Sequence, residues 1–232
     1  MTAISLILLG FMLGLRHAME ADHVAAVASL AVGRRSFLSV AGRAALWGCG
    51  HTLTLFFAAA VVLIAGIPFP PGAAWWFEFA VALMLVALGG DVIRRAIRDR
   101  IHVHTHAHSD GSVHWHAHSH DVVTQETHAH AHHPIKPLVV GMVHGLAGSA
   151  ALLLLVLDSL GGGSWLLGMS YVLMFGVGSI VGMACLSLVI ALPFRIGPPS
   201  LRWQTAVSAV TGLVTVAIGV WLMWELWPLQ VV

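Results

Sequence analysis

Long apolar runs separated by short polar segments dominate this sequence. Six of the runs reach the roughly 20 residues that an α-helix needs to cross the hydrocarbon core of a membrane. They are Ala3–Leu30, Ala44–Ile67, Ala73–Ile93, Leu138–Leu160, Trp165–Leu192 and Thr205–Trp227. The first run has no basic residues ahead of it and is longer than the apolar core of a signal peptide, so we keep it as a span. The pattern predicts an all-α membrane protein with six transmembrane helices.

A hydrophilic stretch divides this pattern into two halves of three spans each. We assign residues 1–94 to the first half, 95–136 to a loop and 137–232 to the second half. Because each half has an odd number of crossings, the second must enter the membrane in the opposite orientation, as in the inverted repeats of many secondary transporters. The segment from Gly14 to His17 in the first span is echoed by Gly141 to His144 in the fourth. We therefore predict two inverted three-helix repeats.

Positive charge is confined to one side of the predicted membrane. Ten of the 11 Lys and Arg residues lie in the segments that follow spans one, three and five, and the exception is Arg16. Basic loops face the cytoplasm, so both termini are predicted to be non-cytoplasmic and the loop 95–136 cytoplasmic. We expect a multi-pass protein of the plasma membrane, which is the inner membrane of a bacterium, with the lipid bilayer as its surroundings.

The composition agrees with a membrane protein and is unusually rich in histidine. Hydrophobic residues make up 58% of the chain, charged residues 9%, and the mean hydropathy is +0.88, whereas about a quarter of a soluble domain is charged. A net charge of +1 argues against nucleic-acid binding. The two cysteines lie in apolar runs and provide no cysteine metal motif. Histidine, with 16 copies, indicates transition-metal chemistry.

Most of the histidines belong to the central loop. Twelve of the 16 lie between His102 and His133, many of them two residues apart. No apolar face accompanies them, so we predict a disordered, histidine-rich tract. Imidazole binds Ni, Cu, Co and Zn, so the tract suits a diffuse metal buffer, and a hydrophilic spacer is the alternative.

Four histidines remain, and all of them lie inside predicted spans: His17, His23, His51 and His144. Ionisable groups at membrane depth are costly and usually mark an ion pathway. A single membrane histidine can instead be an interhelical hydrogen-bond partner, but that explanation does not account for the residues around His17.

Two carboxylates stand beside the histidines of the first span, at Glu20 and Asp22. On a regular helix Glu20 shares a face with His17 and His23, whereas Asp22 points elsewhere. A regular helix therefore predicts Glu20 as the ligand. A broken helix, which is tolerated in a membrane where it lines a cavity, predicts Asp22 as the ligand instead. Asp22 can also orient a metal-binding imidazole by accepting a hydrogen bond from its ring N–H. The candidate metal-binding residues are His17, Glu20, Asp22, His23, His51 and His144.

These residues also resemble a known family. The segment from His17 to His23 is similar to the H-x4-D-H signature of the nickel/cobalt transporter family, and Gly50-His51-Thr-Leu-Thr-Leu-Phe56 resembles the second motif of that family. The resemblance implies a transporter of Ni2+ or Co2+ and not an enzyme, with His17, Asp22 and His23 as metal determinants and His51 as the contribution of the second span. No cofactor is expected beyond the transported ion.

Three departures from the family pattern indicate which branch of the family the chain resembles. Glu20 stands where the signature usually has Asp, typical members have eight spans, and the family's later motif is not recognisable around His144. Six spans with Glu resemble the short, urease-accessory branch of nickel permeases. The histidine-rich loop is reminiscent of efflux members, but Ala21-Asp22 before His23, in place of their Pro-Gly, favours uptake.

Uptake is thus the leading hypothesis, with Ni2+ ahead of Co2+. Efflux of the same metals is an alternative, and so is a non-transporting accessory that hands nickel to cytoplasmic nickel-handling proteins. A zinc transporter of the cation diffusion facilitator type would have cytoplasmic termini, against the charge pattern.

Overall fold

The computed structural model describes residues 3–32, 36–65, 72–98, 102–107, 113–118, 135–145, 165–197 and 200–227. These parts contain seven helices and two short strands. In chain order they are α1 (Ala3–His17), α2 (Ala21–Ala31), α3 (Phe37–Ala65), α4 (Ala73–Arg98), β1 (His102–Ala107), β2 (Val113–His118), α5 (Ile135–His144), α7 (Trp165–Ile196) and α8 (Leu201–Leu226).

Four of the helices, α3, α4, α7 and α8, are long and apolar enough to cross a membrane, and α1 with α2 forms a fifth, bent candidate. The protein is therefore a multi-pass, helical membrane protein. The predicted fourth span begins within the short apolar helix α5, and its continuation to Leu160 lies outside the described residues. The count of six spans stays a prediction.

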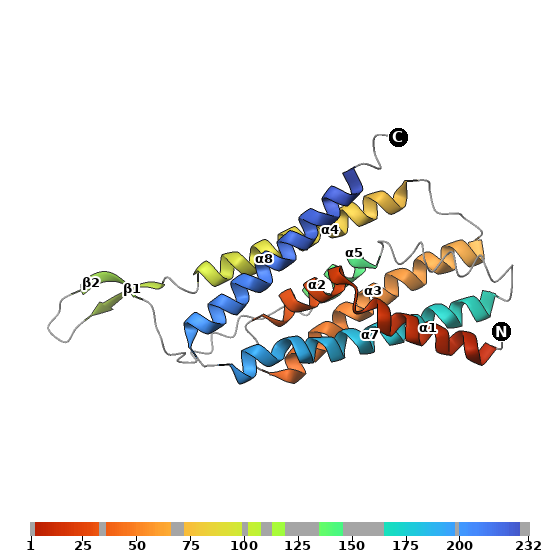
Figure 1. The fold of residues 1–232 in the computed structure, drawn as a ribbon, viewed down its shortest axis with the longest axis horizontal. Coiled ribbons are helices and arrows are strands. Elements are labelled where there is room, and N and C mark those ends of the chain that lie inside the picture. The colour runs from red at the N-terminus through yellow and green to blue at the C-terminus, as the bar shows by residue number, and fades with distance from the viewer. Residues whose placement is uncertain are drawn as a thin grey trace.

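The helices form a bundle in which α1, α3 and α7 pack together and α4 pairs with α8 along its length (Figure 1). The short helices α2 and α5 lie in the middle: α2 contacts α7, α8 and α4, and α5 contacts α3. The short helices α2 and α5 therefore lie between the pair α4–α8 and the group of α1, α3 and α7 (Figure 1). The contact between α4 and α5 includes an ion pair of Asp91 with Lys136, and Asp91 also pairs with Arg94 and Arg95 on its own helix.

Glycines allow two helix pairs to approach each other closely. A Cβ at Gly14 of α1 would collide with the carbonyl of Phe175 in α7, and one at Gly178 of α7 with the carbonyl of Phe11 in α1. The pair α3 and α5 repeats this arrangement, with Gly50 and Gly141 against carbonyls of the other helix. Small residues let helices in a membrane pack backbone against backbone, and here they draw together the helices that carry His17, His51 and His144.

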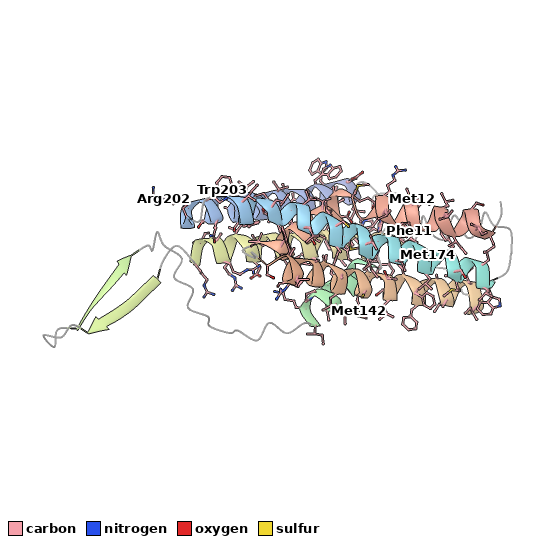
Figure 2. All side chains as sticks on the ribbon, turned by 90° about the horizontal axis from the view of Figure 1, so that it is seen from below. Phe11, Met12, Met142, Met174, Arg202 and Trp203 are labelled. Atoms are coloured by element: carbon pink, nitrogen blue, oxygen red, sulfur yellow. The ribbon has the colours of Figure 1, made fainter. Side chains whose placement is uncertain are left out.

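The outside of the bundle is apolar, as lipid contact requires. Large hydrophobic side chains such as Met12 and Trp224 are 60% and 77% exposed, and Figure 2 shows Met12 and Met142 pointing away from the helices. The described part of the interior holds three hydrophobic clusters. The first lies around Leu55, Tyr171 and Phe175, the second around Trp47 and Leu85, and a small third one joins Ala31, Val40 and Ala191.

The central loop contains an antiparallel hairpin made of β1 and β2 (Figure 1). Its register pairs histidine with histidine at three positions: 102 with 118, 104 with 116 and 106 with 114. The hairpin differs from the disorder that the sequence predicted for this part of 95–136. The physical reason is the spacing of two between histidines, which is also the period of a β-strand. The other loop histidines lie outside the described residues.

Candidate metal centre

The first predicted span is broken at the site. Helix α1 ends at His17, α2 begins at Ala21, and the two are bent by 62°. Glu20 precedes α2 with extended backbone angles, φ −65° and ψ 149°. Of the two forms left open by the sequence, the structure has the broken one, and the bend turns Asp22 and His23 toward the interior.

The four histidines from separate parts of the chain meet in one buried cluster. Their side chains are almost fully enclosed, with exposed fractions of 5% for His17, 1% for His23, 0% for His51 and 1% for His144. His23 is central: its ring centroid lies 4.1 Å from that of His17, 5.2 Å from His51 and 4.3 Å from His144. The break between α1 and α2, the middle of α3 and the end of α5 therefore converge on one point.

Asp22 connects two of these rings. Its Oδ1 accepts hydrogen bonds from the backbone N–H of His23 at 2.9 Å and from the ring Nδ1 of His23 at 3.0 Å. Its Oδ2 accepts from Nε2 of His144 at 2.9 Å. Asp22 lies in the first turn of α2, where the helix dipole stabilises a negative charge. The carboxylate thus fixes the orientation of both rings.

Glu20 contacts a third ring from a more exposed position. Its Oε2 lies 2.9 Å from Nδ1 of His17, and its side chain is 49% exposed, against 23% for Asp22. Both predicted carboxylates therefore touch the histidines. The two carboxylates differ in position, because Asp22 lies among the rings and contacts His23 and His144, whereas Glu20 lies at the edge of the cluster and contacts His17.

The ring nitrogens of the cluster that do not contact Asp22 or Glu20 are buried without a hydrogen-bond partner in the described structure. Nε2 of His17, Nε2 of His23, Nδ1 of His144 and both nitrogens of His51 have no hydrogen-bond partner within the described part of the chain. A buried polar group without a partner costs about 1–3 kcal/mol. A divalent cation would satisfy one lone pair on each ring that binds it, and a carboxylate on the opposite nitrogen is the usual support of a metal-binding histidine.

Two groups of ligand atoms are close enough to hold an ion. One consists of His17, His23 and His51, the other of Asp22, His23 and His144, and within each group the ligand atoms lie within 4.8 Å of one another. Imidazole nitrogen with carboxylate oxygen suits Ni2+, Co2+ and Zn2+. Sulfur is not part of this set, since Cys49 is exposed and Met142 is 39% exposed.

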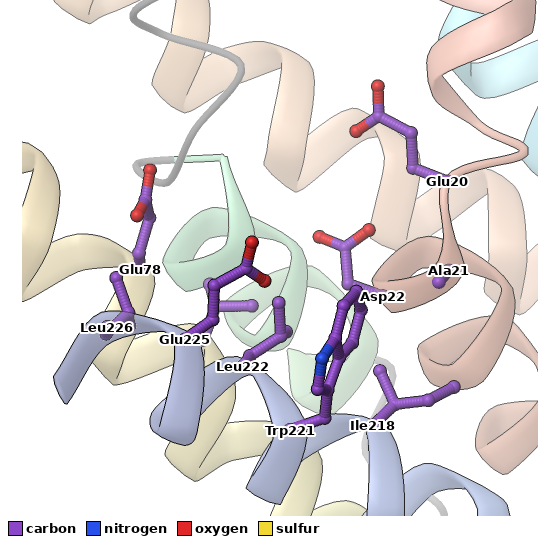
Figure 3. A pocket seen from close by; sticks show the side chains of 10 residues that line it. Glu20, Ala21, Asp22, Glu78, Ile218, Trp221, Leu222, Glu225 and Leu226 are labelled. Carbon is purple, nitrogen blue, oxygen red and sulfur yellow. The ribbon is translucent and has the colours of Figure 1, made fainter. Parts of the chain in front are cut away.

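A pocket of about 460 Å³ opens beside the cluster. Glu20 and Asp22 line it on one side, Glu78 of α4 on another, and Glu225 with Trp221 of α8 on a third. In Figure 3 the four carboxylate groups project into the same space. The pocket therefore joins the surface of the bundle to Asp22 along an acidic wall, which attracts cations.

Trp47 encloses the cluster on another side and was missed by the sequence argument. It is 0% exposed, and its ring lies 5.4 Å from His23, 5.1 Å from His144 and 6.3 Å from His51. Its position four residues before His51 puts both side chains on one face of α3, which is the signal in the sequence that would have identified it. Glu78 was also not among the predicted site residues, because its approach to Asp22 depends on how α4 packs.

Comparison with known proteins gives one clear relative. The urease accessory protein UreH from Bacillus sp. (strain TB-90) is 31% identical over 225 residues, which cover 96% of this chain and 92% of UreH. No family model and no solved structure matches the chain. The match therefore extends over nearly the whole of both chains.

Proposed function

The chain belongs to the nickel/cobalt transporter family, in the branch of the urease accessory protein UreH, and we propose that it takes up Ni2+ across the membrane through the buried histidine and carboxylate cluster. The family is one of membrane transporters and not of enzymes. Co2+ is the second substrate in order of expectation, because imidazole and carboxylate ligands accept both ions. No cofactor other than the transported ion is required.

One observation carries this proposal: five ring nitrogens of four buried histidines lack partners in the described structure. A membrane protein that only packed its helices would satisfy these groups, because an interhelical hydrogen bond is the usual role of a polar residue in a span. His51 is the sharpest case, since both of its nitrogens are unpartnered and it is fully enclosed. A metal cation accounts for the unpartnered lone pairs of the imidazoles that bind it, one nitrogen of each ring.

The acidic pocket provides the access route in this proposal. A hydrated cation would be concentrated by Glu78 and Glu225, exchange water for ligands at Asp22, and pass to the imidazoles. Glu78 lies near the start of α4 and Glu225 near the end of α8, which the charge pattern places on the non-cytoplasmic side. Access from that side corresponds to uptake.

We also propose six spans in two inverted repeats, with both termini non-cytoplasmic. Reciprocal packing supports the repeats: α1 and α7 contact each other through Gly14 and Gly178, as α5 and α3 do through Gly141 and Gly50. In addition, α1 ends at His17 and α5 ends at His144, the two positions that the echo in the sequence pairs.

The segment 95–136 is proposed as a cytoplasmic metal buffer between the halves 1–94 and 137–232. Released Ni2+ would bind its histidines and then pass to cytoplasmic nickel-handling proteins. We place the protein in the plasma membrane, which in a bacterium is the inner membrane.

A second candidate function is favoured by the name of the relative, a urease accessory protein: the chain would deliver nickel to urease without transporting it. Expression in cells separates the possibilities. Uptake predicts that accumulation of radioactive nickel rises and that His17→Gln and His51→Gln abolish the rise. Efflux predicts lower accumulation and higher metal tolerance. An accessory without flux predicts unchanged accumulation together with loop-dependent binding of a partner protein.

A further inference from the structure

The ligand atoms of the metal centre form two overlapping groups that differ in chemistry and in access. His23 belongs to both, while Asp22 and His144 complete one group and His17 and His51 the other. We propose that the cation occupies two alternative positions that share His23. One, the pocket-side position, is formed by Asp22, His23 and His144, and the other, the enclosed position, by His17, His23 and His51. This inference deepens the proposed function and rests on it for the identity of the ion.

The contacts of the pocket-side position also suit neighbouring metal ligands, once the cation replaces the protons that His23 Nδ1 and His144 Nε2 donate to Asp22 and each ring carries its proton on the other nitrogen. Asp22 lies 3.0 Å from His23 Nδ1 and 2.9 Å from His144 Nε2. Metal bonds of about 2.0–2.2 Å that meet at right angles separate two ligand atoms by about 3 Å. Asp22 also lines the acidic pocket. A cation arriving through the pocket therefore meets the carboxylate of Asp22 first, with His23 and His144 directly behind it.

The enclosed position contains imidazole ligands alone. The ring centroid of His17 lies 4.1 Å from that of His23 and 5.3 Å from that of His51. His17 and His51 are 5% and 0% exposed, and of all the ligands of the two positions only Asp22 lines the pocket. A cation at this position is shielded from the pocket and has lost its carboxylate ligand, so the two positions have distinguishable donor sets.

Sharing one ring makes the two positions mutually exclusive. A neutral imidazole carries one proton and offers one lone pair at a time. His23 directs Nδ1 toward Asp22, and its buried Nε2 has no partner among the residues described. A cation bound at one position therefore occupies the ring of His23, which the other position requires as a ligand. The cluster holds one ion at a time, and this ion passes between the positions by exchanging the other ligands around His23.

Equilibrium binding to the purified full-length protein in detergent tests this arrangement. Co2+ is the probe, because its visible spectrum reports the donor set while equilibrium dialysis reports stoichiometry and affinity. The variants are His144→Gln, His51→Gln, the double variant of these two, and His23→Gln. Ser179→Ala is the matched control, since Ser179 is buried at the contact of α7 with the carbonyl of Gly14 in α1 and belongs to neither group.

For mutually exclusive positions the total association constant is the sum of the two. We expect the wild-type protein to bind one ion more than His23→Gln, which keeps the loop histidines and so reports what the loop binds, and loss of the weaker position lowers the affinity of this additional ion by at most about twofold. At least one of the two single variants therefore retains nearly full affinity, and its spectrum corresponds to the remaining donor set. The double variant and His23→Gln lose binding by more than about tenfold beyond either single change.

Two results would overturn the inference. If His144→Gln and His51→Gln each abolish binding as fully as the double variant, all the ligands belong to one site. If the wild-type protein binds two ions more than His23→Gln does, the positions do not share His23. Thermal unfolding of each metal-free variant shows whether a loss comes from misfolding. The binding pattern does not depend on flux, so a protein that binds as expected but does not transport would refute the proposed function and leave the two positions standing.

Discussion

Replacing Asp22 by Asn tests the part of the site that the helix break creates. The substitution keeps the shape of the side chain and removes its negative charge. In the native protein this carboxylate orients the rings of His23 and His144 at 3.0 and 2.9 Å. Asparagine presents one amide nitrogen in place of an oxygen, so at least one ring nitrogen faces a donor instead of an acceptor.

The size of the effect follows from these contacts. Hydrogen bonds to charged groups are worth about 1.5–3 kcal/mol each, and about 1.4 kcal/mol corresponds to a tenfold change in affinity. Asp22→Asn removes a ligand of the pocket-side position and releases the ring of His23, which both positions use, so we expect it to lower Ni2+ affinity at least about tenfold at both positions. Glu20→Gln affects a single ring from a side chain that is 49% exposed, so we expect a loss of about tenfold or less.

Isothermal titration of the purified protein with Ni2+ measures both variants, and Glu20→Gln serves as the matched carboxylate control. Metal-free thermal unfolding checks that each variant is folded. Equal losses in the two variants, or wild-type affinity in Asp22→Asn, would refute the assignment of Asp22 to the centre of the site.

Three further predictions follow from the pocket, the helix contacts and the loop. The double variant Glu78→Gln/Glu225→Gln should raise the KM for metal uptake about tenfold at low ionic strength with little change in kcat, and a difference that persists at high salt would contradict an electrostatic role. Gly14→Ala places a methyl group against a carbonyl and should lower the unfolding free energy by about 1–3 kcal/mol, whereas Gly42→Ala, where a Cβ would have nothing within 4 Å, should not lower the unfolding midpoint, because alanine is the better helix former. Deletion of residues 102–133 should reduce the efficiency of uptake without abolishing it, and complete loss of flux from this deletion would contradict the buffer role.

Hydropathy predicted the long helices well because lipid exposure is a property of composition. The span predicted at Trp165–Leu192 corresponds to α7, which continues to Ile196 with Pro193 inside it. The span predicted at Thr205–Trp227 corresponds to α8, which begins earlier because Ser200 caps it by accepting a hydrogen bond from the N–H of Trp203. Ends of this kind depend on caps and on single hydrogen bonds, to which a hydropathy window is insensitive.

The members of the buried histidine and carboxylate cluster were predictable from the sequence, but their arrangement was not. The cost of burying imidazole identified His51 and His144 from sequence alone, and the structure brings them together with His23. The choice between Glu20 and Asp22 was not decidable from spacing, because it turns on a 62° bend that the periodicity of a regular helix does not contain. The pocket and the place of Trp47 depend on contacts between distant helices, which no local pattern records.

Flux of Ni2+ into liposomes that contain only the purified protein tests the central claim most directly. With a metal-sensitive dye inside, the wild-type protein should give saturable Ni2+ uptake, His51→Gln should reduce it to the rate of protein-free liposomes, and Ser179→Ala should transport as the wild type does. Saturable uptake at the wild-type rate in His51→Gln, or no flux above empty liposomes in the wild type, would contradict transport through the buried histidine cluster.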